Sequence, residues 1–222
     1  MAGWVKIIIG ECIIPFMTDA EYEAVSKAKR QRDSGNPKGA LDTLEAYLLG
    51  DPYNSKVRML VSQIAFSCKM DQYGLLQLDA IIDYDPENIE ARKALVTVLK
   101  KNKRNNKECK ELFEYLVEHC PDDADVINSY AIFCKMQLLD FDRAAELYEM
   151  AIAIDPKNAD YHLNYAILLV NDRKDYVKGR EELEKVVELD PYNVRAKDAL
   201  DRLIKKKFKD GKPKKGLFSR KQ

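Results

Sequence analysis

The chain has 222 residues, of which 46% are apolar and 33% are charged, and it contains only nine glycines and eight prolines. This composition allows a sizeable core, favours long helices joined by short turns, and argues against a β fold with many turns. Residues 205–222 carry nine of the 37 basic and one of the 37 acidic residues, so a basic C-terminal end follows an acidic body. Such an uneven charge is typical either of an interaction arm or of a solubilising, unstructured terminus.

The apolar stretch from Trp4 to Met17 does not read as a membrane anchor. It includes two charged residues, is shorter than the roughly 20 residues a membrane helix needs, and lacks the features of a signal peptide. A cytosolic start at Met17 is the simpler interpretation, with residues 1–16 as an upstream addition and 1–20 as an N-terminal extension. The odd number of cysteines without C-x-x-C spacing favours free, mostly buried thiols. We therefore expect a cytoplasmic protein with no transmembrane segment.

One short phrase occurs five times: an Asp or Cys, then Pro, and then Asn or Asp two residues after the Pro. The prolines are Pro52, Pro86, Pro121, Pro156 and Pro191, which are 34, 35, 35 and 35 residues apart. Proline ends the preceding helix, and the Asn or Asp side chain can cap the next one. Thr18 and Glu21 form a capping box that starts the first helix in the same way.

Between these phrases each unit divides into two helices. Apolar residues at helical spacing fill both halves, as in Tyr130 to Cys134 and Ala144 to Ile152. A short polar break such as 171–174 separates the halves. A helical hairpin of this size cannot bury its apolar face alone, so neighbouring hairpins must stack.

This pattern resembles the tetratricopeptide repeat family. The family has small residues at positions 8 and 20, large apolar residues at 24, apolar residues or Ala at 27, and Pro at 32 of each repeat. Position 8 is occupied by Ala28, Ser62, Val96, Ala131 and Ala166, and position 20 by Ala40, Gly74, Cys109, Ala144 and Gly179. Position 24 is occupied by Leu44, Leu78, Phe113, Tyr148 and Leu183, and position 27 by Tyr47, Ile81, Leu116, Ala151 and Val186. Val96 departs from the pattern.

The resemblance implies an all-α fold, a right-handed α-solenoid of antiparallel helix pairs closed by a C-terminal capping helix. The expected repeats are 21–54, 55–88, 89–123, 124–158 and 159–193. Residues 194–208 form the capping helix, whose polar outer face closes the stack, and residues 209–222 form a basic, disordered tail.

The resemblance also implies that the first helices of the repeats line a concave groove. The expected partner-binding residues are Lys56, Met59, Gln63, Lys93, Thr97, Asn128, Ile132, Asn164 and Ile167. Asn side chains can hold the backbone of an extended peptide through both their donor and acceptor groups. The alternative for any one of these positions is a solvated helix face. The chain departs from the carboxylate clamp of the family's chaperone adaptors, since Asn164 and Arg195 are its only matches.

Catalytic and metal-binding motifs are missing from the sequence. It has no phosphate-binding glycine loop, no nucleophile elbow and no zinc motif, and it has only two histidines. His119 and Cys120 are neighbours that point in different directions on a helix, and His162 reads as a structural histidine. Cys109 and Cys134 read as core. We therefore expect no enzyme activity, no cofactor and no metal.

The leading functional prediction is a protein–protein interaction scaffold or adaptor that binds a peptide or helix of a partner in the groove. The alternative is a ribosome- or nucleic-acid-associated factor anchored by the basic tail. The tail residues expected to meet an anionic partner are Lys205, Lys206, Lys207, Lys209, Lys214 and Lys215. The acidic body argues against wrapping nucleic acid.

Overall fold

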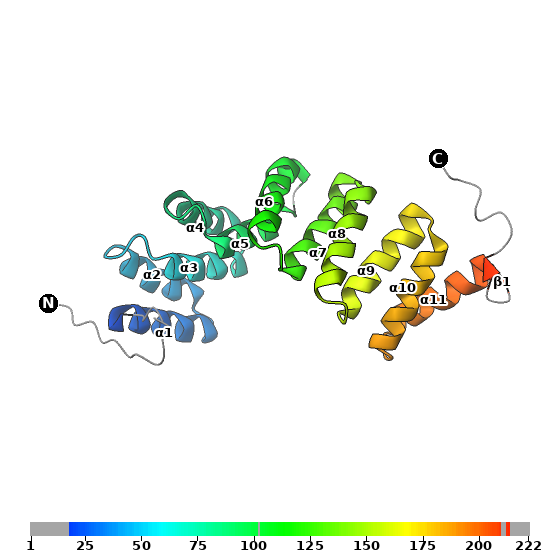
Figure 1. The fold of residues 1–222 in the computed structure, drawn as a ribbon. Helices are drawn as coiled ribbons and strands as arrows, with labels where there is room; N and C mark the ends of the chain where they lie inside the picture. The colour runs from blue at the N-terminus through cyan, green and yellow to red at the C-terminus, as the bar shows by residue number, and fades with distance from the viewer. Residues whose placement is uncertain (1–17, 102, 210–211, 214–222) are drawn as a thin grey trace, which may run out of the picture. The chain divides into compact units, whose positions relative to one another are not determined.

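The computed structural model describes residues 18–101, 103–209 and 212–213. These residues form two compact units, unit 1 up to Leu95 and unit 2 from Val96 onward, and both are built from helices (Figure 1). The expected all-α fold is confirmed, with one very short pair of strands added near the C-terminal end. Within the described ranges, no helix has both the length and the apolar character needed to cross a bilayer.

Unit 1 is made of two helical hairpins and the start of a third. Its helices are α1 (Asp19–Asp33), α2 (Pro37–Leu48), α3 (Ser55–Ser67), α4 (Asp71–Tyr84) and α5 (Ile89–Leu99), the last of which runs into unit 2. Helix α1 packs on α2, and α3 packs on α4. Ala28, Leu44, Val61 and Ile64 are among the buried residues of the core they share.

Unit 2 continues the same alternation. After a 3₁₀ turn at Lys103–Asn105, its helices are α6 (Asn106–His119), α7 (Ala124–Phe133), α8 (Phe141–Ile154), α9 (Ala159–Leu168), α10 (Tyr176–Leu189) and α11 (Val194–Lys207). From α6 to α11 each helix packs on the next, and the helices follow one another in chain order (Figure 1). Phe113, Tyr130 and Tyr148 are fully buried and serve packing, whereas Tyr53 and Tyr192 are exposed.

The proline phrases act as helix boundaries, as expected. Helices begin directly after each Asn or Asp of the phrase, at the first residue of each expected repeat from the second onward. Each of these side chains accepts a hydrogen bond from a backbone N–H in the first turn of the helix that follows it. The five residues are Asn54, Asn88, Asp123, Asn158 and Asn193. Thr18 Oγ1 accepts from Glu21 N at 3.1 Å and starts α1 at Asp19, slightly before the expected first repeat.

The small residues at position 20 allow the two helices of a hairpin to touch, which confirms their predicted role. All five are buried. A Cβ added to Gly74 would lie 2.5 Å from Phe66 Cε1, and a Cβ added to Gly179 would lie 2.6 Å from Val170 Cγ2. Both glycines are therefore needed for the close approach of their neighbours.

The polar breaks of the last two hairpins are tighter than the sequence suggested. Helix α7 continues into a π turn, η2 (Cys134–Leu138), and α9 continues into η3 (Leu169–Arg173). Each π turn is closed by one left-handed residue, Leu139 at φ 56° or Lys174 at φ 59°. The chain thus reverses direction with almost no loop, which holds the turn residues close to the helices.

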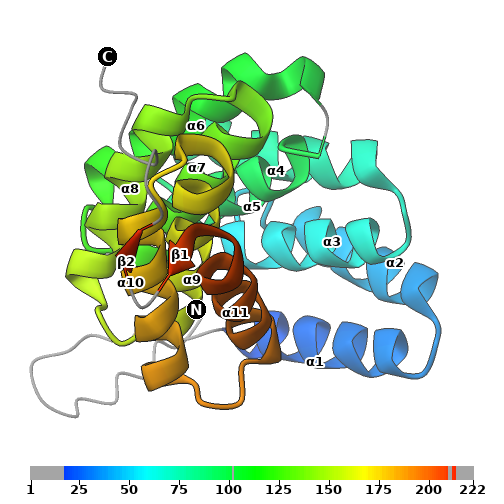
Figure 2. The ribbon, with the colours of Figure 1, turned by 90° about the vertical axis from the view of Figure 1, so that its right-hand side faces the viewer.

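The C-terminal end differs from the expected disordered tail 209–222. After α11, strand β1 (Phe208–Lys209) pairs antiparallel with β2 (Lys212–Pro213), next to α10 and α11 (Figure 2). The reason is Phe208, which is 6% exposed, packs into the cluster of α9, α10 and α11, and lies 5.2 Å from the Arg180 guanidinium. Lys214, Lys215 and the rest of that tail lie outside the described residues.

A network of charged and phenolic side chains joins α8, α9 and α10. Lys178 Nζ lies 2.5 Å from Glu149 Oε1, and the Tyr165 hydroxyl donates to the same carboxylate. Hydrogen bonds from Lys178 and then Tyr165 hold the pKa of Glu149 below its ordinary value. Burial and the bond to Glu149 raise the pKa of Tyr165 to about 12. The network therefore holds Glu149 in its charged form.

The contact at Gly179 can be tested by adding one methyl group. Alanine gains about 1 kcal/mol of helix propensity over glycine, whereas overpacking costs about 1–3 kcal/mol. We expect Gly179→Ala to lower the free energy of unfolding by about 1 kcal/mol in urea denaturation, because the stiff Val170 side chain cannot move away easily. Adding Val170→Ala to the same chain should remove most of the loss; a Gly179→Ala protein that is more stable than wild type would contradict the close approach.

The Glu149 network predicts a pH dependence of stability. Because the folded-state pKa is depressed, its stabilisation is present above the unfolded pKa of about 4.5 and is lost as the pH falls through the lower folded value. We expect Glu149→Gln to be less stable than wild type near neutral pH, with a gap that closes in acid. The gap should be modest, since both Glu149 and Lys178 are partly exposed.

The measurement is chemical denaturation of both proteins from about pH 7 to about pH 3. Lys178→Met removes the main cause of the shift and should give the same closing gap. A gap of constant size across this range would show that Glu149 contributes only packing.

Candidate functional site

The first helices of the last two hairpins, α7 and α9, and the capping helix α11 carry the candidate site in unit 2. We call the surface formed by α7, η2, α9, η3 and α11 the groove face; it carries Asn128, Ile132, Asn164 and Ile167. Tyr161 of α9 donates to Asp125 Oδ1 of α7 at 2.6 Å, which fixes these two helices side by side. The second helix α8 packs on α7 and α9, and the second helix α10 packs on α9 and α11.

Two predicted site residues on the groove face contact each other. Asn164 Nδ2 donates to Asn128 Oδ1 at 3.2 Å, and both side chains are half-buried. This bond uses one donor of Asn164 and one acceptor of Asn128, and each amide has further donor and acceptor capacity. The pair therefore offers amide groups, held in a fixed orientation, to a ligand on this face.

The two predicted isoleucines each line a cavity on the groove face. Ile132, which is 38% exposed, belongs to a cavity of about 350 Å³ that we call the α7 cavity. Its lining residues are Lys100, Lys101, Ser129, Ile132, Phe133, Met136 and Gln137. Ile167 is half-buried and belongs to the cavity described next.

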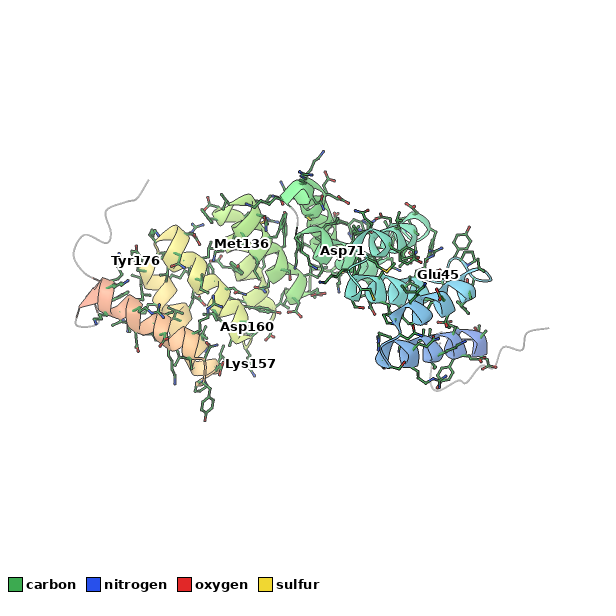
Figure 3. The ribbon with its side chains drawn as sticks, turned by 180° about the vertical axis from the view of Figure 1, so that it is seen from behind. Glu45, Asp71, Met136, Lys157, Asp160 and Tyr176 are labelled. Atoms are coloured by element: carbon green, nitrogen blue, oxygen red, sulfur yellow. The ribbon has the colours of Figure 1, made fainter. Side chains whose placement is uncertain are left out.

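The second cavity lies between α9 with η3 and α11, and its volume is about 500 Å³. We call it the basic cavity, because every charged residue that lines it is Lys or Arg. Its lining residues are Ile167, Val170, Asn171, Tyr176, Arg195, Ala199, Arg202, Leu203, Lys206 and Lys207. Figure 3 shows Met136 of the α7 cavity and Tyr176 of the basic cavity toward one edge of unit 2, away from Lys157 and Asp160 at the other edge.

Most residues of the basic cavity were not among the expected groove residues. Lys206 and Lys207 were predicted to lie in the capping helix 194–208 and to meet an anionic partner, and the structure places them in the last turn of α11. The Lys207 ammonium lies 4.4 Å from the centre of the Tyr176 ring. Arg195 and Arg202 occupy in α11 the repeat positions that line the groove in earlier repeats. Continuing that spacing into the sixth first helix would have identified both.

The remaining predicted groove residues lie on α3 and α5. Lys56 and Gln63 are exposed and Met59 is half-buried on α3, while Lys93 is half-buried and Thr97 exposed on α5. Lys93 Nζ lies 3.3 Å from Glu90 Oε1. Neither the α7 cavity nor the basic cavity includes any of the five.

A third cavity, of about 360 Å³, lies on the α8–α10 side of unit 2 and has a different character. Its charged residues pair with one another, as in Arg173 Nη1 with Asp142 Oδ1 at 2.5 Å and Lys178 with Glu149. Four acidic residues and two basic residues line it; they are Asp142, Glu146, Glu149, Asp175, Arg173 and Lys178. The two cations of this cavity are thus already paired with carboxylates of the protein itself.

The groups that could serve nucleophilic or metal chemistry are held in structural roles. Burial raises the pKa of Cys109 and of Cys134 to about 11, so both thiols are protonated at neutral pH. His162 has both ring nitrogens occupied, Nδ1 by Glu182 Oε2 at 2.6 Å and Nε2 by Pro156 O at 3.0 Å. In the described part of the chain, no three His, Cys, Asp or Glu side chains are grouped to hold a metal ion.

Known structures resemble this chain in fold. A tetratricopeptide repeat protein from Parabacteroides merdae superposes with a TM-score of 0.71 at 15% identity, covering 83% of this chain and 72% of its own. MamA from Desulfovibrio magneticus RS-1 gives a TM-score of 0.69 at 20% identity over 81% of this chain and 99% of its own. YrrB, described as a tetratricopeptide repeat protein with an unusual peptide-binding site, gives 0.65 at 17% identity over 80% and 90%.

The sequence comparisons assign the chain to no family. No protein-family model matches the chain, and no curated protein matches it. The repeat phrases, the buried small residues at position 20 and the structural superpositions agree with one another. The chain has the fold of the tetratricopeptide repeat proteins.

Proposed function

We propose that this protein is a non-catalytic scaffold that holds a peptide or a helix of a partner protein on its groove face. The observation that carries the proposal is the Asn128–Asn164 pair on a face where Ile132 and Ile167 each line a cavity. Amide groups that can bind a peptide backbone thus lie on the same face as pockets that can take its side chains.

The chemistry of the face suits recognition rather than reaction. Asn side chains can donate to a backbone carbonyl and accept from a backbone N–H, which gives affinity without regard to peptide sequence. Half-exposed isoleucines beside cavities of several hundred Å³ supply apolar anchor sites for partner side chains. The occupied ring of His162 and the protonated thiols of Cys109 and Cys134 support a non-catalytic role.

Two further considerations support this reading. YrrB, which has the same fold, is described as having a peptide-binding site. The free thiols of Cys68, Cys109, Cys120 and Cys134 suit the predicted cytoplasmic location. By the same repeat spacing, we also propose as partner-binding residues those predicted on α3 and α5, which are Lys56, Met59, Gln63, Lys93 and Thr97.

A random peptide library selected against the full chain tests the proposal. We expect enriched peptides whose affinity falls about tenfold or more on the double variant Ile132→Gln/Ile167→Gln, because both apolar anchor sites are then lost. The measurement is fluorescence anisotropy with each enriched peptide.

The matched control is Met150→Gln/Ile154→Gln on α8. Both of these side chains are 39% exposed, close to the 38% of Ile132, but they lie outside the groove face. Peptides that lose affinity equally on both variants, or a library that yields no binder, would refute the scaffold role. Unchanged thermal unfolding of the variants would confirm that the fold survives.

A further inference from the structure

We propose that the basic cavity selects an acidic segment of the partner, one that carries an apolar side chain among Asp and Glu residues. This inference rests on the proposed function and adds the chemical class of the ligand. It also gives the end of the solenoid, α11, a part in binding.

The charge of the cavity is the first argument. Four of its ten lining residues are cations and none is Asp or Glu. Arg202 Nη2 lies 3.6 Å from Asp198 Oδ2 on the exposed side of α11. No acidic side chain in the described ranges pairs with Arg195 or Lys206. The cavity therefore holds more positive charge than its own surroundings neutralise.

The arrangement of these cations on α11 is the second argument. Arg195, Arg202 and Lys206 are spaced by seven and four residues, so they lie along one stripe of the helix. Ala199 and Leu203 share this stripe and line the cavity between the cations. A segment lying along α11 would meet charge and apolar surface in alternation.

The opposite wall supplies the apolar anchor site. Ile167 and Val170 are half-buried there and pack against the same apolar cluster as Leu203. Asn171 adds an exposed amide. Tyr176 is held by the Lys207 ammonium at 4.4 Å, so its ring forms a fixed side of the cavity. Such a lining fits a leucine-sized or phenylalanine-sized side chain.

The third cavity of unit 2 gives an internal comparison. In that cavity Arg173 pairs with Asp142 and Lys178 pairs with Glu149, both at 2.5 Å. The positive charge of these two cations is therefore neutralised before any ligand binds. The two cavities belong to one compact unit and are built from the same repeats. The surplus of cations in the basic cavity is thus a local feature, and not a consequence of the composition of the unit.

Positive charge also acts beyond the cavity itself. Lys135 of η2 lies 3.6 Å from Asp172 of η3. Burial lowers the pKa of Lys135, Asp172 raises it, and Arg195 lowers it again. Arg195 thus repels a second base across the groove face, and an anionic ligand beside Arg195 would relieve this repulsion.

An acidic protein segment fits better than a nucleic acid. A phosphate backbone would use the cations but would leave Ile167, Val170 and Leu203 without a partner. Single-stranded nucleic acid is held largely by bases stacked on aromatic rings, and Tyr176 is the one aromatic residue that lines this cavity. The acidic body of the chain also repels a polyanion more than a short acidic segment.

The test uses the full chain and the peptides enriched from the random library. We expect Asp and Glu to be enriched beside an apolar residue. Their affinity should fall about tenfold or more on Arg202→Glu/Lys206→Glu, and the same loss should follow when glutamines replace the glutamates of the peptide. Binding should weaken as salt is raised.

The matched control is Lys157→Glu/Lys197→Glu. It changes the net charge by the same amount within unit 2, at exposed residues that do not line the cavity. We expect less than about a twofold change in peptide affinity. An equal loss on both variants would show that general charge attracts the peptide, which would overturn the proposed site.

Other outcomes separate the two proposals. If enriched peptides depend on Ile132 and Ile167 but are neutral or basic and ignore Arg202→Glu/Lys206→Glu, the acidic ligand is refuted and the scaffold role stands. If a fluorescent oligouridylate binds more tightly than any peptide and loses affinity on the same variant, the cavity is a nucleic-acid site and the inference fails. If the variant instead changes the oligomeric state in size-exclusion chromatography and no peptide responds to it, the occupant is a second copy and the inference also fails.

Discussion

The two helices of each hairpin can approach closely only because a small residue stands where their backbones meet. At Gly179 there is no room for even a methyl group beside Val170, and at Gly74 the ring of Phe66 fills the same space. This contact fixes the angle of the second helix on the first, so consecutive hairpins repeat the same geometry. The regular exposure of first helices on one face, and with it the groove face of unit 2, follows from that repetition.

Much of the fold could be predicted from the sequence because local chemistry decides it. An Asn or Asp after a proline caps a helix wherever it stands, and all five such side chains accept the expected hydrogen bond. The residues at positions 8, 20 and 24 are buried for the same reason, since one repeat packs like the next.

The candidate site was less predictable, because it depends on where the repeat pattern ends. The sequence predicts Lys206 and Lys207 within the capping helix 194–208, but a run of lysines does not indicate which of them line a cavity. Their place beside Tyr176 follows from Leu203 and Phe208, which anchor α11 and the residue after it. The candidate groove residues on α7 and α9 could be named from the sequence because their spacing repeats, whereas Arg195 and Arg202 lie in a helix that has no following partner.

The two sides of unit 2 use charge in different ways. On the α8–α10 side, acids and bases neutralise each other and tie neighbouring helices together through Glu149, Lys178 and Tyr165. On the groove face, the cations of α11 border an apolar hollow and have few acidic neighbours. Internal pairing stabilises the fold, and unpaired charge beside apolar surface is what a binding site requires.

Because every repeat boundary has the same capping chemistry, the gene of this protein can gain or lose whole repeats. Every repeat from the second onward begins after an Asn or Asp that caps its first helix, at an interval of 34 or 35 residues. Excision of 124–158 would join Asp123 to Ala159, and an Asp would then cap α9 where an Asn does now. Recombination between repeats therefore rejoins chemically equivalent ends, so the length of the protein can evolve in whole periods while its terminal helix and the cavity beside it are inherited intact.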